Sequence, residues 1–407
     1  MSGNLSEEAI DNILLSYRIM FWVYCTVLPL ILFPGMFVTF ASVVLFGQKL
    51  KQSANQFASR QHGTGSESLN TLLLGLSFYD FLVLVNAALV YIPMGQCNHA
   101  KNRVACAVFD STMQFTYPLS LTAQFCSVWT CAAITIDRYL AVRYPLQSRK
   151  WCTMSKTFGC LVVITVTAVI YRFPTVFEWT HNEFGQVIPT SLRMNAVYHK
   201  IYHFYCSLVI MFIVPWCIMI VLNIIIYRSI QQAQAQRLTL AANRKETRES
   251  RKPFIMALLV VVTFLLFNLL AFINHMLEAL IPFPNPEGAF YIWQRSLVFV
   301  SNLMICCNSA SNFLIYCALG RWFRQSFINT FCFACVLLGK RFRSAASETE
   351  EDHTLFKSRF SYQSTKTTKL SRTPFIDQKE LEMLTHHHHH QLKKASAVNN
   401  TTDDENL

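Results

Sequence analysis

The chain has 407 residues, of which 53% are hydrophobic and only 14% are charged, and its formal net charge is +12. Soluble domains carry about 25% charged residues, so the composition excludes an ordinary soluble protein. The positive charge does not indicate nucleic-acid binding, because the basic residues lie beside apolar segments and no basic stripe with interleaved aromatic residues occurs. Contact with anionic membrane lipid, and with acidic faces of a cytosolic partner, explains them more simply.

Seven apolar segments follow one another along the chain. They cover residues 19–46, 69–94, 109–141, 154–177, 200–228, 253–281 and 291–319. About 20 residues cross the hydrocarbon core as a helix, so each segment is predicted to span a membrane. Ser, Thr, Asn, Cys and Tyr recur within several of them and predict faces packed against other helices. The predicted fold class is an all-α membrane protein with a seven-helix bundle.

Lys and Arg are distributed unequally between the connections. The connections 47–68, 142–156 and 228–252 are rich in basic residues, and the opposite set is poorer. Basic connections stay in the cytoplasm, so we expect a multi-pass plasma-membrane protein with its N-terminus outside and its C-terminus inside. Asn4, in the sequence Asn-Leu-Ser, is then an extracellular glycosylation candidate. The connection 47–68 is rich in Ser, Gln, Gly and Asn and is predicted to be flexible.

Asp80 lies inside the second segment. An ionised carboxylate that faces lipid costs about 2.5 to 3.5 kcal/mol on insertion scales, so Asp80 is expected to face the bundle interior. Ser127, Asn308 and Asn312 lie at comparable depth in the third and seventh segments. The four side chains are predicted to form a polar network, although such a network can also serve only to fix packing.

Two further features belong to the third and fifth segments. Asp137, Arg138 and Tyr139 close the third segment, and an acid–base pair at the end of a spanning helix is costly enough to require a function. A simple interfacial salt bridge is the alternative. Pro215 removes a backbone hydrogen bond within the fifth segment and permits a bend there.

Three motifs in order on these segments carry a family resemblance. They are Leu76-Ser77-Phe78-Tyr79-Asp80, Asp137-Arg138-Tyr139 and Asn312-Phe313-Leu314-Ile315-Tyr316. The chain resembles a rhodopsin-like (class A) G-protein-coupled receptor. The phrases YPLSLTAQFCSVWT, IVPWCIMIVLNIIIYRSI, NLLAFINHMLEAL and NSASNFLIYCALG, together with Phe313, are similar to invertebrate FMRFamide-type neuropeptide receptors.

The resemblance implies a mechanism and a possible ion. Arg138 would pair with Asp137 at rest and move toward Tyr227 and Tyr316 when the sixth helix moves outward. The network of Asp80 could hold an allosteric sodium ion or waters. The resemblance implies no other cofactor or metal.

Several residues depart from the family pattern. The first segment has Gly35-Met36 where Gly-Asn is usual, and the fourth lacks its interior Trp. The sixth reads Phe267-Asn268-Leu269-Leu270-Ala271 and lacks the usual Trp and Pro, so Asn268 and Asn274 are expected to supply polar contacts instead. Residues 178–199 contain no Cys. Cys97 and Cys106 are therefore the candidates for a local disulfide, with two free thiols as the alternative.

The resemblance places a ligand pocket between the third, fifth, sixth and seventh helices. Ser120 stands where an amine receptor needs an acid, and Cys306 stands near the depth at which a retinal protein needs a lysine, so amine and light sensing are not expected. A peptide ending in Arg-Phe-amide needs a carboxylate, an aromatic cleft and amide or hydroxyl groups. Glu278 is the first choice for the guanidinium, followed by Glu178 and Glu183. Further candidate ligand contacts are Tyr117, Gln124, Tyr205, Asn274, Trp293 and Gln294.

The C-terminal part is predicted from composition. Residues 320–335 alternate bulky apolar and basic side chains and are similar to the family's amphipathic eighth helix, and Cys332 and Cys335 are palmitoylation candidates. Residues 336–407 are predicted to be a disordered cytoplasmic tail. Phosphorylated Ser and Thr in this tail are expected to bind an arrestin-like partner, unless the tail is only a spacer. His386–His390 are interpreted as low-complexity sequence.

The sequence therefore predicts an extracellular N-terminus (1–18), a seven-transmembrane receptor domain (19–319), the amphipathic helix (320–335) and the tail (336–407). The predicted function is binding of an extracellular neuropeptide and activation of a heterotrimeric G protein by a helix-bundle shift. The alternatives are a receptor of the same fold for a non-amidated peptide or a small chemosensory molecule, or a transporter or channel. No phosphate-binding glycine loop, zinc-spaced Cys/His set or nucleophile elbow occurs, so an enzyme is not expected.

Overall fold

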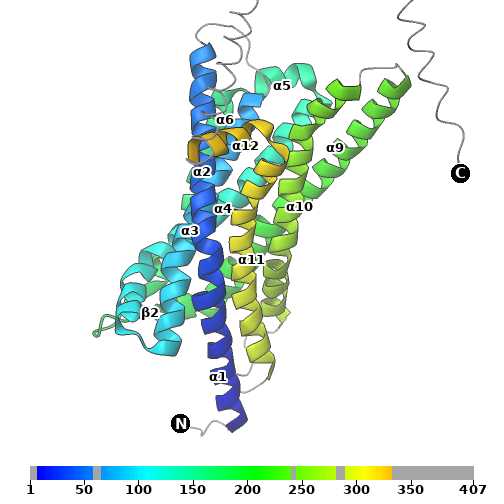
Figure 1. The fold of residues 1–407 in the computed structure, drawn as a ribbon. Helices are drawn as coiled ribbons and strands as arrows, with labels where there is room; N and C mark the ends of the chain where they lie inside the picture. The colour runs from blue at the N-terminus through cyan, green and yellow to red at the C-terminus, as the bar shows by residue number, and fades with distance from the viewer. Residues whose placement is uncertain (1–6, 58–65, 240–243, 281–288, 332–407) are drawn as a thin grey trace, which may run out of the picture. The chain divides into compact units, whose positions relative to one another are not determined.

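Figure 1 shows the computed structural model of the chain, which describes residues 7–57, 66–239, 244–280 and 289–331. Helices make up nearly all of this part. In chain order they are α1 (Glu7–Phe21), a π-helical turn (Trp22–Val27), α2 (Leu28–Phe57), α3 (Ser66–Ala100), α4 (Arg103–Arg143), α5 (Pro145–Trp151), α6 (Met154–Arg172), a 3-10 turn (Phe173–Phe177), α7 (Ser191–Met194), α8 (Ala196–Tyr198), two π-helical stretches (His199–Cys206 and Leu208–Ile213), α9 (Val214–Thr239), α10 (Arg244–Leu280), α11 (Ala289–Leu319) and α12 (Arg321–Phe331).

Seven helical stretches in the described part are long and apolar enough to cross a membrane. They are Tyr17–Asn55, Glu67–Asn98, Arg103–Arg143, Met154–Phe177, Ala196–Gln232, Phe254–Leu277 and Trp293–Leu319. Each overlaps one of the seven predicted segments in order, which confirms the seven-helix bundle. Leu30, Phe33, Phe37 and Phe40 are exposed on one face of α2. Their spacing of three and four residues gives the stripe that a lipid-facing helix presents.

The helices extend beyond the apolar segments that predicted them. α2 continues to Phe57 and α3 begins at Ser66, so much of the predicted connection 47–68 is helical and only residues 58–65 between the two helices lie outside the described part. α4 begins at Arg103 because Asn102 caps it. The Asn102 side-chain oxygen accepts hydrogen bonds from the backbone N–H groups of Val104 and Ala105 at 3.0 and 3.4 Å.

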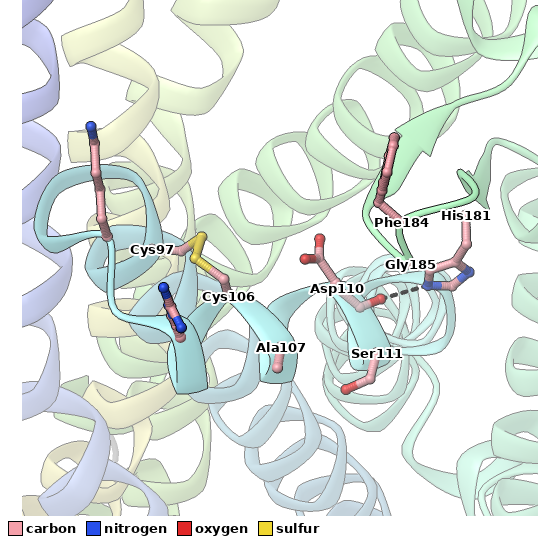
Figure 2. A pocket seen from close by; sticks show the side chains of 10 residues that line it. Cys97, Cys106, Ala107, Asp110, Ser111, His181, Phe184 and Gly185 are labelled. Atoms are coloured by element: carbon pink, nitrogen blue, oxygen red, sulfur yellow. Dashed lines mark hydrogen bonds between the residues drawn. A yellow bond between two sulfur atoms is a disulfide. The ribbon is translucent and has the colours of Figure 1, made fainter.

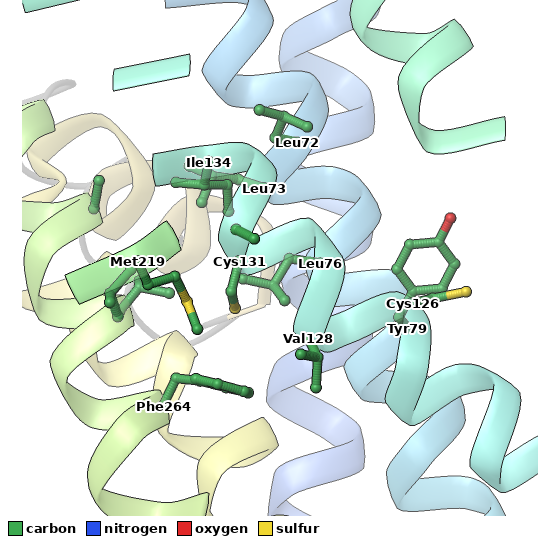
Figure 3. Packing of buried hydrophobic residues seen from close by; sticks show 14 of the residues in the cluster. Leu72, Leu73, Leu76, Tyr79, Cys126, Val128, Cys131, Ile134, Met219 and Phe264 are labelled. Atoms are coloured by element: carbon green, nitrogen blue, oxygen red, sulfur yellow. The ribbon is translucent and has the colours of Figure 1, made fainter. Parts of the chain in front are cut away.

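A buried apolar core joins the central helices (Figure 3). α4 packs on α3, α6, α9 and α10. Leu73 and Leu76 of α3, Cys131 of α4, Met219 of α9 and Phe264 of α10 belong to one cluster, and each is at most 2% exposed. Because close-packed interiors resist changes in volume, this cluster fixes the helix positions on which the polar sites depend.

The first helix packs against the bundle through a second cluster. Met20, Tyr24, Leu28 and Leu32 are fully buried against residues of α3 and α11. A side chain at Gly35 would come within 3.1 Å of the Ala310 Cβ. The glycine at this position therefore permits the close approach of α2 to α11.

The fifth spanning stretch is irregular before Pro215. The π-helical segment Leu208–Ile213 ends immediately before Val214 and Pro215. Proline lacks the backbone N–H that would close the preceding helical turn, and a π-helical turn is a common accommodation of such an interruption.

A short hairpin crosses one end of the bundle. β1 (Trp179–His181) pairs antiparallel with β2 (Val187–Pro189), in the register Trp179 opposite Pro189. The connecting turn places Gly185 at φ +72°, in the left-handed region that glycine adopts without strain. We call the end of the bundle that carries β1 and β2 the hairpin end, and the opposite end, where α12 lies, the α12 end (Figure 1).

α12 lies where the amphipathic helix was predicted. Its Phe323 is 2% exposed and its ring packs against Phe46 of α2 and against Phe313 and Tyr316 of α11. The α12 helix is described to Phe331, so the predicted palmitoylation sites at Cys332 and Cys335 and the tail 336–407 lie outside the described residues. Asn4 lies outside them as well.

Candidate functional site

A pocket of about 470 Å³ lies among the spanning helices toward the hairpin end, and we call it the main pocket. Its lining comes from α3, α4, α6, α7, the fifth spanning stretch, α10 and α11. The polar lining residues are Tyr91, Tyr117, Ser120, Gln124, Arg172, Arg193, His199, His203, Ser207, His275 and Asn302. The lining in the described part thus contains two arginines and three histidines and no carboxylate.

Only some of the predicted ligand contacts line the main pocket. Tyr117 and Gln124 line the main pocket, as does Ser120, at the position where an amine receptor would need an acid. Trp293 is 66% exposed and does not line it, because its side chain lies at the start of α11 and away from the cavity.

Four other candidates lie in different environments. Tyr205 is exposed and Gln294 is half-buried, and neither lines the main pocket. Asn274 is 8% exposed, and its side-chain oxygen and nitrogen have no hydrogen-bond partner in the described part. Glu278 lies in the last turn of α10, and its side chain is outside the described residues.

Glu178 is fully buried beside the main pocket and is engaged by three donors. Arg193 Nη1 donates to one carboxylate oxygen at 2.6 Å, and the Tyr198 hydroxyl donates to the other at 2.8 Å. His203 Nε2 lies 2.7 Å from that second oxygen. Arg193 also donates to the Tyr117 hydroxyl at 3.0 Å. Glu178 was predicted as a reserve partner for a ligand guanidinium, and instead it binds the receptor's own arginine.

The charges of this cluster stabilise each other. Burial alone raises the pKa of the Glu178 carboxyl, but the hydrogen bond and charge of His203, the charge of Arg193 and the Tyr198 hydroxyl outweigh it and bring the pKa below its ordinary value. Burial lowers the pKa of Arg193, and Tyr117 and Glu178 raise it to a net value above the usual one. The pair is therefore ionised at neutral pH.

A second cavity of about 530 Å³ lies beside the hairpin, and we call it the hairpin recess (Figure 2). Lys101, Arg103, Asp110, His181 and Phe184 belong to its lining. Figure 2 shows Asp110 of α4 beside His181 of β1. The His181 Nε2 atom lies 2.7 Å from the backbone oxygen of Asp110.

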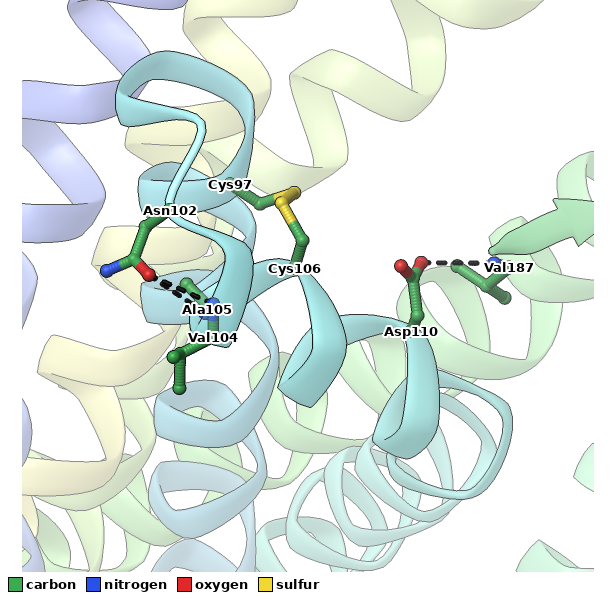
Figure 4. The surroundings of a disulfide bond; sticks show 7 residues. All are labelled: Cys97, Asn102, Val104, Ala105, Cys106, Asp110 and Val187. Atoms are coloured by element: carbon green, nitrogen blue, oxygen red, sulfur yellow. Dashed lines mark hydrogen bonds between the residues drawn. A yellow bond between two sulfur atoms is a disulfide. The ribbon is translucent and has the colours of Figure 1, made fainter. Parts of the chain in front are cut away.

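A disulfide closes the connection between α3 and α4 (Figure 4). Cys97 and Cys106 are bonded and lie nine positions apart in the sequence. The hairpin itself carries no cysteine, and α4 holds it by a hydrogen bond instead. Asp110 Oδ1 accepts from the backbone N–H of Val187 at 3.0 Å (Figure 4).

Asp80 is completely buried between α3, α4 and α11. Its carboxylate accepts from Ser127 at 2.8 Å, from Ser309 at 3.1 Å and from the Asn312 side-chain nitrogen at 2.8 Å. Ser309 was not predicted. Asn308, which was predicted, is buried but makes no hydrogen bond to Asp80, and its side-chain oxygen has no partner in the described part. The Asn312 side-chain oxygen is also buried without a hydrogen-bond partner in the described part.

Asp137 and Arg138 form an ion pair near the α12 end. Both side chains are 6% exposed, and Arg138 donates to Asp137 from Nε at 3.0 Å and from Nη2. The Ser68 hydroxyl of α3 donates to the other Asp137 oxygen and lies 2.8 Å from the Thr157 hydroxyl of α6. The Arg138 guanidinium lies 5.8 Å from the centre of the Phe254 ring of α10. The pair on α4 thus contacts α3 and α10, and Ser68 links it to α6.

The remaining residues predicted for the switch lie apart from this pair. Tyr316 is 1% exposed and packs edge-on against Phe46. Tyr227 of α9 is 56% exposed and its hydroxyl accepts from Gln231 on the same helix. Tyr139 is half-buried beside the Tyr144 ring. The contacts described for Arg138 are with Asp137 and with the Phe254 ring.

The sequence pattern of the 7 transmembrane receptor (rhodopsin family) matches residues 57–316. This match covers more than half of the chain and includes Asp80, Asp137, Arg138 and Asn312. The chain belongs to the rhodopsin family of seven-transmembrane receptors. As a rhodopsin-family receptor it is a multi-pass membrane protein and not an enzyme.

Individual relatives of this rhodopsin-family receptor are similar over most of its length. The FMRFamide receptor of Drosophila melanogaster is 27% identical over 80% of this chain, which spans 57% of the length of that protein. The FMRFamide peptide receptor frpr-18 of Caenorhabditis elegans is 30% identical over 75% of this chain, and the match covers 68% of that protein. The sex peptide receptor of Drosophila melanogaster is 25% identical over 64% of this chain, and the match covers 65% of that protein.

The sixth spanning helix of this receptor contains a buried asparagine, Asn268. Asn268, which lies in the stretch without the usual Trp and Pro, is buried, and its side-chain nitrogen donates to the backbone oxygen of Phe264 at 2.9 Å. This contact is within its own turn of α10, so Asn268 makes a local bond. Asn268 was predicted to supply a polar contact, and the contact described for it is this bond within α10.

Sequence reasoning missed the basic part of the receptor's main pocket. Arg172, Arg193, His199 and His203 line it, but in the sequence Arg172 and Arg193 were counted only as charges of the connections. The available signal was the position of Arg172 at the end of a spanning segment. A basic residue there usually extends toward the lipid headgroups, and only the packing shows that this one turns inward.

Proposed function

We propose that this rhodopsin-family receptor binds an extracellular neuropeptide of the Arg-Phe-amide type and activates a heterotrimeric G protein. The observation that carries the proposal is the main pocket, which lies toward the hairpin end and contains aromatic and hydrogen-bonding side chains such as Tyr91, Tyr117 and Gln124. Two relatives that are similar over most of the chain are named as FMRFamide receptors.

The proposed orientation places the hairpin end outside the cell. The disulfide Cys97–Cys106 lies at that end, and disulfides persist in oxidising compartments. The basic residues Arg143, Arg149, Lys150 and Lys156 lie in or next to α5 and α6 at the opposite end, which agrees with a cytoplasmic location. The predicted extracellular N-terminus and cytoplasmic tail follow from this orientation.

The proposed mechanism is a population shift. The ion pair of Asp137 and Arg138 is tied to α3 and α6 through Ser68 and Thr157 and is covered by Phe254 of α10. This arrangement stabilises a resting state. A ligand that binds more tightly when α10 has moved outward would shift the equilibrium and open a cleft for the G protein near Arg138.

Sodium is proposed to bind within the network of Asp80. The side-chain oxygens of Asn308 and Asn312 are buried without partners in the described part, and Asp80 carries a negative charge when ionised. Together with the Ser127 hydroxyl, these oxygens fit the ligand preference of a small hard cation. Agonist potency measured with sodium replaced by an organic cation tests this site, and potency that does not change would exclude it.

The first experiment is a G-protein activation assay in cells that express the chain. The panel consists of amidated peptides ending in Arg-Phe-amide and their free-acid forms. Activation by the amides is expected, because the uncharged carboxamide fits a pocket of hydroxyl and amide groups. Silence across the panel with surface expression confirmed would contradict the proposed ligand class while the receptor fold stands. Arrestin recruitment before and after alanine replacement of the tail Ser and Thr residues tests the proposed tail partner.

Glu278 is the proposed partner of the peptide guanidinium. Position 278 is three residues beyond His275, which lines the main pocket, and residues three apart share a helix face. We expect Glu278→Gln to reduce the potency of an Arg-Phe-amide peptide about tenfold or more, since a hydrogen bond to a charged group contributes about 1.5 to 3 kcal/mol. Glu183→Gln, in the exposed hairpin turn, is the control. Wild-type potency of Glu278→Gln at normal surface expression would refute the assignment.

A further inference from the structure

Arg172 is a buried cation that faces the main pocket. It is the last residue of α6 and is 5% exposed, and it is one of the residues that line the cavity. Its guanidinium carbon lies 4.7 Å from the centre of the Tyr171 ring. Its Nε atom is buried and has no hydrogen-bond partner in the described part of the chain.

No acid balances this charge among the described residues. The ion pairs in this part of the chain join Arg138 to Asp137, and Arg193 and His203 to Glu178. Arg172 interacts electrostatically with Tyr171, Tyr202 and Tyr117, and it also shares a side-chain hydrogen bond with Tyr202. Tyrosine is neutral at physiological pH. Glu178 is already satisfied by three donors. Arg172 is therefore positioned differently from Arg193, which has its own carboxylate.

Two common structural roles do not account for the burial of the Arg172 charge. A basic residue at the end of a spanning helix usually extends to the lipid headgroups, but a side chain that is 5% exposed does not reach them. Stacking on Tyr171 gives a cation–π contact, which compensates only part of the cost of burying a charge. The hydrogen bond with the Tyr202 hydroxyl is neutral and leaves the charge unbalanced. Ionisable residues kept inside a membrane bundle without a charged partner are typical of functional sites.

A ligand in the main pocket changes the surroundings of Arg172. A cavity of about 470 Å³ that has polar groups in its lining admits water, which hydrates the guanidinium in the free receptor. A peptide that fills the cavity displaces this water. Unless the peptide itself offers an acceptor, the guanidinium becomes desolvated and unpaired, which opposes binding. A carboxylate is the acceptor that matches a guanidinium best, because it accepts two parallel hydrogen bonds.

We propose that Arg172 binds a carboxylate of the ligand, so the natural peptide carries an acidic residue upstream of its Arg-Phe-amide end. This inference rests on the proposed function and specifies the ligand class further. α6 packs on α3 and α4, whereas α10, which carries Glu278, packs mainly on α11. The two receptor charges thus come from different sides of the bundle. The peptide binds with its acid toward α6 and its arginine toward α10.

The test uses synthetic hexapeptides that end in Arg-Phe-amide. At each of the four upstream positions in turn, one peptide carries Asp and its partner carries Asn, and the other upstream residues are Ala. G-protein activation is measured on wild-type receptor. At one position we expect the Asp peptide to be about tenfold or more potent than the Asn peptide, the size of effect that a charged hydrogen bond gives. The free-acid forms of the Asn peptides show whether a terminal carboxylate is used instead.

Receptor variants then assign the effect to Arg172. In Arg172→Gln the Asp and Asn peptides are expected to become about equal in potency. Arg172→Lys keeps the charge but loses the planar fork, so it should retain part of the preference, and it is also the variant to use if Arg172→Gln does not reach the cell surface. Arg103→Gln is the matched control, because Arg103 is an exposed cation in the lining of the hairpin recess. It should preserve the full preference.

The outcomes separate this inference from the function on which it rests. If no amidated peptide activates the receptor, the proposed function fails. If amidated peptides activate it but every Asp and Asn pair is equally potent, the function stands and the carboxylate inference is overturned. A preference for Asp that survives in Arg172→Gln, or that is lost in Arg103→Gln, would overturn the assignment to Arg172. Free acids that gain potency only when Arg172 is present would support the carboxylate and contradict amidation.

Discussion

At the scale of single residues, the main pocket depends on which carboxylates are already paired. Glu178 appeared in the sequence as an acid near the end of a spanning segment, and such an acid can bind a ligand cation. The structure surrounds it with Arg193, His203 and Tyr198. Its charge is used to hold the segment after the hairpin against the fifth spanning stretch. A residue that appeared suited to recognition therefore positions Arg193 and Tyr117 at the pocket wall.

Replacement of Glu178 tests this positioning role. We expect Glu178→Gln to destabilise the receptor in detergent by about 1–3 kcal/mol at neutral pH, because it leaves the Arg193 guanidinium without its carboxylate. The exposed Glu183→Gln serves as the control and should leave the melting temperature unchanged.

The effect of Glu178 should also depend on pH in a defined direction. Its pKa in the folded receptor lies below the ordinary value, so its stabilisation is fully present above the carboxyl pKa of the unfolded chain. The stabilisation is lost as the pH falls through the lowered pKa. The difference in melting temperature between wild type and Glu178→Gln should therefore shrink on acidification. A difference that stays constant down to strongly acidic pH would contradict the ion pair.

At the scale of elements, the hairpin is held against α4 by hydrogen bonds and not by a disulfide. The disulfide Cys97–Cys106 closes only the short connection between α3 and α4. The hairpin is held by the Asp110 carboxylate, which accepts from Val187, and by the contact of His181 with the Asp110 backbone. Hydrogen bonds at an exposed site open far more readily than a disulfide. The strands β1 and β2 should therefore separate from α4 in the native receptor.

Asp110→Ala tests the attachment of the hairpin. The substitution removes the acceptor for the Val187 N–H, and the loss of about 1 kcal/mol corresponds to roughly fivefold faster local opening. Hydrogen exchange of residues 179–189 should increase by about this factor. Ser111→Ala is the control, since the Ser111 hydroxyl bonds only to the Val108 backbone of its own helix. Equal exchange in Asp110→Ala and wild type would show that other contacts hold the hairpin.

At the scale of the whole molecule, two buried polar groups connect neighbouring helices of the bundle. Asp80 joins α3, α4 and α11, and Asp137 joins α3, α4 and, through Ser68, α6. The apolar core around Leu76 and Cys131 lies between them and resists gradual deformation. Such a bundle is expected to change between discrete arrangements.

Ser68→Ala tests the resting arrangement. Ser68 is 1% exposed and links Asp137 to Thr157. Loss of about 1 kcal/mol from the resting state should raise ligand-independent G-protein activation roughly fivefold where the active fraction is small. Ser148→Ala is the matched control, because Ser148 is also buried but bonds to Pro145 within α5. Unchanged basal activity in Ser68→Ala at equal surface expression would argue against this link as a restraint.

The seven spanning helices were predictable because lipid imposes a simple requirement. Backbone hydrogen bonds must be satisfied within each segment, so an apolar run of sufficient length becomes a helix. For the same reason Asp80 had to face the interior, where the structure places it. Helix ends were less predictable. α2 continues through polar residues to Phe57. The requirement for backbone hydrogen bonds within each segment applies only in the hydrocarbon. Beyond it polar residues can also be helical, so the apolar pattern does not mark the end of the helix.

The sequence by itself determined that this protein is a seven-helix membrane receptor, because composition, run length and three ordered motifs depend on local chemistry. Only the tertiary structure decided which charges are paired. Glu178 binds Arg193, Ser309 joins the network of Asp80, and Arg172 turns into the main pocket without an acid in the described part. These contacts join residues far apart in the chain. The direction of each side chain depends on how neighbouring helices pack, which no local pattern in the sequence specifies.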